Sequence, residues 1–129
     1  MATNRSVEKF QRVMAAVGPA ILAPIKAETF RQAEILRGTM LLKVPANRGR
    51  LRSTIRTEQG AKPMRVLVKA GGDATRVHGY DYAIAQEFGT QHNQAQPFFW
   101  PSYRARKARI RREIKKAARA AINQIVPLK

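Results

Sequence analysis

Apolar residues recur at helical spacing at both ends of this 129-residue chain, and this pattern constrains the fold more than any other feature. Residues 6–40 and residues 102–125 each carry an apolar face of this kind. Gly18-Pro19 and Pro24 interrupt the first pattern. Because a proline inside a helix removes a hydrogen bond and clashes with the preceding turn, we expect two helices or one kinked helix there.

The region between these helices carries the signals of a small sheet. Residues 51–57 are rich in β-branched side chains, and in residues 64–69 apolar side chains partly alternate with basic ones. Gly60 and Pro63 supply a turn, so the two segments can pair as a hairpin. We therefore predict one α+β domain over residues 1–129, with N-terminal helices and a basic C-terminal helix packed on a small antiparallel β-sheet.

Residues 82–88 fit either a short helix or a strand, because periodicity over seven residues does not separate the two. Gly89 is expected to permit a backbone turn after this segment. Phe88 is expected to fill the core together with Ile84.

Net charge is the outlier in the composition. The chain has 25 Lys and Arg against 8 Asp and Glu, a formal net charge of +17. Such a chain repels itself and implies an acidic partner, whether nucleic acid, an anionic membrane surface or an acidic protein. The chain has no cysteine, which excludes disulfides and thiolate metal sites. It also lacks a continuous apolar run of bilayer length and the apolar core of a signal peptide, so a soluble, non-secreted protein with no membrane partner is expected.

The C-terminal helix carries much of the excess positive charge, offset there only by Glu113. Its face could be merely solvated, could contact nucleic-acid phosphates, or could dock on an acidic protein ring. We rank the last two level and above the first, because solvated faces normally mix the two signs of charge. The predicted docking or DNA-facing residues are Arg104, Arg106, Lys107, Arg109, Arg111, Arg112, Lys115, Lys116 and Arg119.

A proline-bounded aromatic cluster precedes this helix. Its rings could stack on bases, but their tight spacing between two prolines favours packing into the core or into a neighbouring subunit. Glu87, an isolated acid in a basic chain, is expected to pair with an arginine such as Arg52 or Arg56, within or between subunits. The predicted interface residues are Tyr82, Glu87, Phe88, Phe98, Phe99, Trp100 and Tyr103.

Enzyme chemistry has little support in this sequence. His78 and His92 are the only histidines, and no His/Asp/Glu set has metal-ligand spacing. Asp73, Asp81 and Glu87 could form an acid/base pair, but no phosphate-binding loop or nucleophile motif accompanies them. We expect Asp73 to be a turn residue and the other two to be partners of arginines. No catalytic residue, cofactor or metal is predicted.

Three motifs carry a resemblance to the siphophage neck and tail-component proteins of lambdoid and related phages. They occur in order and span most of the chain, with a helical segment before them and a charged helix after them. The motifs are Val44-Pro45 with Gly49-Arg50-Leu51-Arg52-Ser53-Thr54-Ile55, then Tyr82-Ala83 with Glu87-Phe88-Gly89-Thr90, then Gln96-Pro97-Phe98 with Pro101.

This resemblance implies a structural virion protein that is not an enzyme. Such a protein forms a ring at the head–tail junction, in a neck, tail-completion or tail-terminator role, and joins the portal or connector to the tail tube. The resemblance implies a homo-oligomer, with six copies favoured over twelve, in contact with adjacent connector and tail proteins. It also implies a place in the virion, after a stay in the host cytoplasm before assembly.

The main alternative is a small basic nucleic-acid-binding protein. Charge supports this alternative, and even a neck protein could contact packaged DNA without reading its sequence. The chain shows no helix-turn-helix, zinc-finger or aromatic-sheet motif that would strengthen it. A nuclease or another phage-encoded enzyme is a second rival, weakened by the missing acidic metal site.

Overall fold

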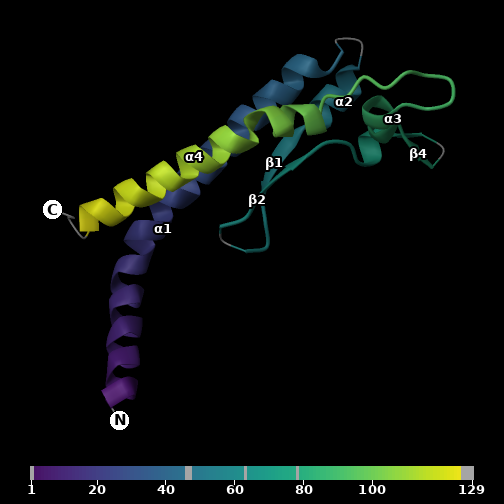
Figure 1. Ribbon diagram of the computed structural model, residues 1–129. Helices are drawn as coiled ribbons and strands as arrows, with labels where there is room; N and C mark the ends of the chain where they lie inside the picture. Colours follow the sequence, from purple (N-terminus) through teal and green to yellow (C-terminus); the bar gives the residue numbers. More distant parts are fainter. Residues whose placement is uncertain (1, 46–47, 63, 78, 126–129) are drawn as a thin grey trace.

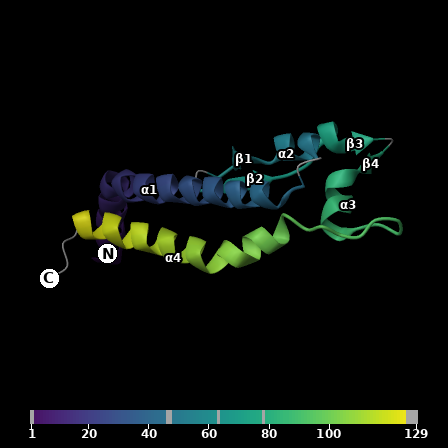
Figure 2. The ribbon, with the colours of Figure 1, turned by 90° about the horizontal axis from the view of Figure 1, so that it is seen from above.

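The computed structural model describes residues 2–45, 48–62, 64–77 and 79–125, and only the backbone of residues 2–4, 14 and 80 among them. Two helices dominate it and lie side by side over much of their length (Figures 1 and 2). The elements in chain order are α1 (Ala2–Lys43), α2 (Gly49–Thr54), β1 (Arg56–Gln59), β2 (Val66–Lys69), the 3₁₀ turn η1 (Asp73–Thr75), β3 (Arg76–Val77), β4 (Tyr80–Asp81), α3 (Tyr82–Phe88) and α4 (Trp100–Ile125).

Helix α1 is one kinked helix, as its prolines predict. Its limbs, Arg5–Val13 and Ala15–Lys43, meet at 41°. A proline ring clashes with the carbonyl four residues before it, and for Pro19 that residue is Ala15, where the second limb begins. The first limb consequently points away from the rest of the molecule (Figure 1).

No single helix in the described ranges is both long and apolar enough to cross a membrane. The two limbs of α1 reach that length and composition only when they are taken together across their bend.

The predicted hairpin is present. Strands β1 and β2 pair antiparallel, with Arg56 opposite Lys69 and Gln59 opposite Val66. A hydrogen bond from the Gly60 amide to the Arg65 carbonyl, 2.6 Å long, closes the turn, whereas Pro63 lies outside the described residues. A second small antiparallel pair joins β3 to β4.

The prediction of a strand over residues 51–57 is wrong for most of that segment, which begins as helix α2. The helical turn buries Leu51 completely and lets Arg52 donate to the carbonyls of Leu41 (2.5 Å) and Val44 (3.4 Å), at the end of α1. Those carbonyls would otherwise lack partners, because a helix leaves its last four acceptors free. The burial of Leu51 and this cap outweigh the β propensity of the segment.

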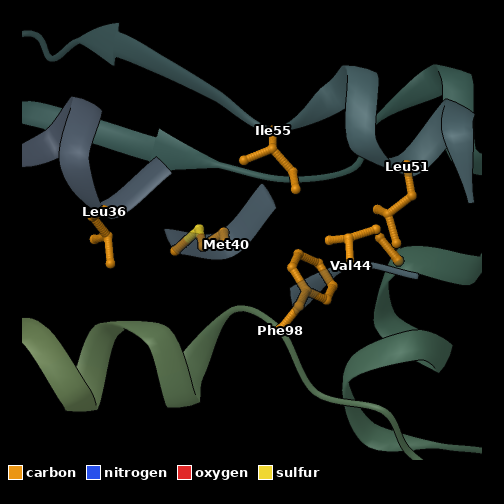
Figure 3. Packing of buried hydrophobic residues seen from close by; sticks show 7 residues of the cluster. Leu36, Met40, Val44, Leu51, Ile55 and Phe98 are labelled. Carbon is orange, nitrogen blue, oxygen red and sulfur yellow. The ribbon is translucent and has the colours of Figure 1, made fainter. Parts of the chain in front are cut away.

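Helix α1 lies between the β1–β2 hairpin and α4 (Figure 2). The core gathers around its C-terminal half, where Met40 and Val44 meet Leu51, Ile55 and the fully buried Phe98 ring (Figure 3). Two helices packed with small antiparallel strands make this an α+β fold, which confirms the predicted class.

We predict that Leu51→Ala lowers the free energy of unfolding by about 2–5 kcal/mol, because it removes a fully buried leucine and leaves a cavity. Leu42→Ala is the matched control, since Leu42 is 87% exposed and its loss should change stability by less than about 0.5 kcal/mol. Denaturant unfolding followed by circular dichroism measures both. Equal losses in the two variants would show that the core does not lie where we place it.

Candidate functional site

The Glu87 carboxylate caps the start of α4. Its Oε2 atom accepts hydrogen bonds from the backbone amides of Phe98 (2.8 Å) and Phe99 (2.9 Å), and its Oε1 atom accepts one from Trp100 (2.9 Å). The first amides of a helix lack partners within it and carry partial positive charge, so a carboxylate is well suited to them. Glu87 is only 7% exposed, which makes it an internal residue of the chain.

Gln86 reinforces the attachment of α3 to the segment before α4. Its side-chain amide donates to both the backbone and side-chain oxygens of Gln96, each at 3.1 Å. The Gln96 backbone amide in turn donates to the Gln86 carbonyl at 2.9 Å. After α3 the chain turns at Gly89, whose φ of 80° suits glycine and confirms the predicted turn.

The predicted pairing of Glu87 with Arg52 or Arg56 is therefore not made within the chain. Arg52 caps α1, and Arg56 donates to Glu58 and to the carbonyls of Thr54 and Gly71. Asp81 likewise serves a helix start: it accepts from the Ala83 amide (2.9 Å) and from the Thr75 hydroxyl (2.7 Å). Both acids thus bind backbone amides at the start of a helix, in place of the arginine partners that we predicted for them.

An exposed apolar patch lies beside this cap and consists of Ile84, Phe88 and Trp100, which are 61%, 67% and 45% exposed. The expectation that Phe88 and Ile84 fill the core is wrong, because α3 buries Ala83, Gln86 and Glu87 instead. On a helix, Ile84 and Phe88 are four residues apart and share a face that this buried set leaves free. The three residues line one open pocket of about 440 Å³.

The predicted interface residues divide between the interior and the surface. Phe98, 1% exposed, belongs to the core, and Glu87 belongs to the helix cap. Phe88 and Trp100 reach the surface in the apolar patch. Ile84 also belongs to this patch, although the sequence had indicated a place in the core for it. Helical spacing with Phe88 was the one signal that could have revealed it.

The remaining predicted aromatics are partly buried. The Phe99 and Trp100 rings pack edge-on, with their centroids 5.1 Å apart. The Trp100 and Tyr103 rings pack in the same way, with their centroids 6.2 Å apart. Tyr82 lies 6.0 Å from the guanidinium of Arg48, measured to the ring centroid. These contacts within the chain support the packing interpretation of the cluster over base stacking.

The cations beside the apolar patch have acidic partners. Glu58 lies 2.9 Å from Arg56 and 2.7 Å from Lys69, and hydrogen bonds from Lys69 and then Arg56 lower the pKa of Glu58 below its ordinary 4.5. Ionised Glu58 therefore stabilises the hairpin at pH values above 4.5. This stabilisation is lost as the pH falls through the lowered pKa of Glu58. Arg76 lies 3.6 Å from Asp73, the residue that begins η1 as predicted for a turn residue.

The cations of helix α4, in contrast, lack acidic partners among the described residues. In the described ranges every ion pair involves α1, the hairpin or η1, and none involves α4. Eight of its nine predicted basic residues are exposed, and Arg106 is the partly buried exception that turns toward α1. We call the eight exposed residues the basic face: Arg104, Lys107, Arg109, Arg111, Arg112, Lys115, Lys116 and Arg119.

Metal-ligating groups do not come together in the part of the chain that the structure describes, where no three His, Asp or Glu residues could share an ion. His92 lies exposed in the loop before the aromatic cluster, and His78 lies outside the described residues. No family model, curated protein or solved structure matches this chain.

We predict that Glu87→Ala destabilises the protein by about 3 kcal/mol. Three amides at the start of α4 would lose a charged acceptor, and each unsatisfied buried group costs about 1–3 kcal/mol, less where water can reach it. Glu87→Gln, which keeps one acceptor oxygen, should be intermediate. Chemical denaturation measures stability, and hydrogen exchange at Phe98 to Trp100 reports the cap directly.

Glu8→Ala removes an exposed acid from α1 and is the control, with an expected change below about 0.5 kcal/mol. Unchanged stability and unchanged amide exchange in Glu87→Ala would remove Glu87 from its structural role.

Proposed function

We propose that this protein is a structural component of a tailed bacteriophage that assembles into a ring at the head–tail junction. The observation that carries the proposal is the convergence of the three sequence motifs on one structural unit. Arg52 of the first motif caps α1 at Val44, Glu87 of the second caps the start of α4 at Phe98 of the third, and Leu51 packs with Phe98. Segments that form one folded unit are better evidence of a common signature than three separate short matches.

Exposed apolar residues support assembly into a larger structure. The patch of Ile84, Phe88 and Trp100 is one such surface. A second lies on the N-terminal limb of α1, where Val7, Phe10 and Val13 are 49–64% exposed along one side of the helix. Contiguous apolar surfaces on a soluble chain commonly mark interaction sites. Two different surfaces on one subunit suit head-to-tail contacts, which form a ring where the rotation between neighbouring copies closes.

The charge of the chain bears on when such a ring forms. Copies that each carry +17 repel one another at low ionic strength, and acidic neighbours or salt would relieve that repulsion. The proposal therefore includes connector and tail proteins with acidic faces as partners. It also includes a free monomer that exists before those neighbours are present. Six copies are favoured over twelve on the resemblance alone.

A small nucleic-acid-binding protein is the second candidate, and the unpaired charge of the basic face favours it. In that role the chain would act as a monomer bound to DNA, with no need for its exposed apolar residues to meet another copy. Oligomeric state separates the two candidates.

We predict that raising the salt concentration from 0.1 M to 1 M converts the purified protein into a discrete ring, because the range of charge repulsion shrinks from about 10 Å to about 3 Å while apolar contacts strengthen. Sedimentation velocity measures the assembly at each salt concentration, and native mass spectrometry counts the subunits after crosslinking. The double variant Ile84→Ser/Phe88→Ser should remain monomeric.

Leu42→Ser is the matched control, since it also replaces an exposed apolar residue but lies outside the patch, and it should assemble as the original chain does. A protein that stays monomeric at every salt concentration would contradict the ring proposal and favour the second candidate.

A further inference from the structure

The basic face of α4 is fixed in direction by the packing of the helix. Ile110, Ala117 and Ala121 lie on the side that meets α1 and are partly or fully buried. At 100° per residue, Arg112, Lys115 and Arg119 project from the opposite side. Helix α1 runs along α4, so these side chains are presented on a supported surface and not on a free, fraying helix (Figure 2).

The composition of this surface is restricted to three residue types. Every exposed residue from position 104 to position 120 is Arg, Lys or Ala. The face offers no exposed Asn, Gln, Asp or Glu there to read adenine or cytosine edges. A partner that contacts it meets positive charge and little else.

These charges are also uncompensated. In the described part of the chain, the five ion pairs leave all eight residues of the basic face unpartnered, whereas Arg56 and Lys69 share Glu58. Eight like charges on one supported helix repel one another, so the face gains most from a partner with a dense array of anions.

The spacing of the charges suits one class of partner. From Arg104 to Arg119 the helix extends about 23 Å, at 1.5 Å per residue, and the five cations that point furthest from α1 place one positive charge per ~4.5 Å along it. One strand of duplex DNA carries one negative charge per ~3.4 Å of helix axis. An acidic protein would need an equally dense run of unpaired carboxylates to match it.

We propose that the basic face of α4 docks on the phosphate backbone of duplex DNA without reading its sequence. The inference deepens the proposed function by adding packaged DNA as a partner of the ring, and it rests on that function only for the source of the DNA. Contact itself is a property of the single chain. Five residues point away from α1 strongly enough to reach phosphates together, and these are Arg104, Arg112, Lys115, Lys116 and Arg119.

The test is fluorescence anisotropy of a labelled 24-base-pair duplex titrated with the full chain between 50 and 300 mM salt. Five phosphate contacts predict that log Kobs falls with log salt at a slope of about −4.5. Two duplexes of unrelated sequence should bind within about threefold of each other. The triple variant Arg112→Glu/Lys115→Glu/Arg119→Glu should bind at least about 100-fold more weakly at 100 mM salt, with a slope shallower by about 3.

The matched control is Arg5→Glu/Lys9→Glu/Arg12→Glu, which makes the same change in net charge on the exposed first limb of α1. It should lose less than about threefold in affinity, because those residues lie off the basic face. Arg112→Gln/Lys115→Gln/Arg119→Gln provides a milder variant if the charge reversal unfolds α4, and circular dichroism checks both.

Equal losses in the α4 and α1 triple variants would overturn the assignment, because binding would then follow net charge alone. Absence of DNA binding at 50 mM salt would also overturn it, as would displacement of the DNA by an equimolar concentration of polyglutamate carboxylates, which would favour an acidic protein partner. Each result is obtained on the free chain, so the test of DNA binding does not depend on whether the protein assembles into a ring.

Discussion

The hydrogen bonds from the start of α4 to the Glu87 carboxylate are the constraint on which the rest of the structure depends. They join α3 to α4 across an eleven-residue separation in sequence, with Gln86 and Gln96 joined beside them. Because Phe98 follows the cap directly, its ring enters the core against Met40 and Val44 at the point where α4 begins its path along α1. One carboxylate thus sets both the entry of the main core aromatic and the direction of the longest basic element.

The same arrangement determines which surfaces remain free. With Gln86 and Glu87 turned inward, α3 presents Ile84 and Phe88 outward next to Trp100. With the apolar side of α4 laid on α1, Arg112, Lys115 and Arg119 face away from the protein. The result is an apolar patch and a basic face on separate surfaces, so a second subunit and an anionic partner could be engaged at once without competition for one site.

Sequence patterns predicted the elements whose periodicity is long and missed the features set by partners distant in sequence. The C-terminal helix, the kink near Pro19 and the β1–β2 hairpin followed from local spacing. Helix α2 did not, because burial of Leu51 and the cap that Arg52 places on α1 override the β propensity of residues 51–57. The partners of Glu87 were missed for a related reason: backbone amides exist at every position, so no residue pattern marks the three that a carboxylate will bind.

Cryo-electron microscopy of the assembled phage particle is the measurement that tests the proposed function most directly. The account predicts a closed ring of this chain at the head–tail junction, with Ile84, Phe88 and Trp100 buried where neighbouring subunits meet. A particle whose neck and tail lack the chain, or a ring in which those three side chains face solvent, would contradict it.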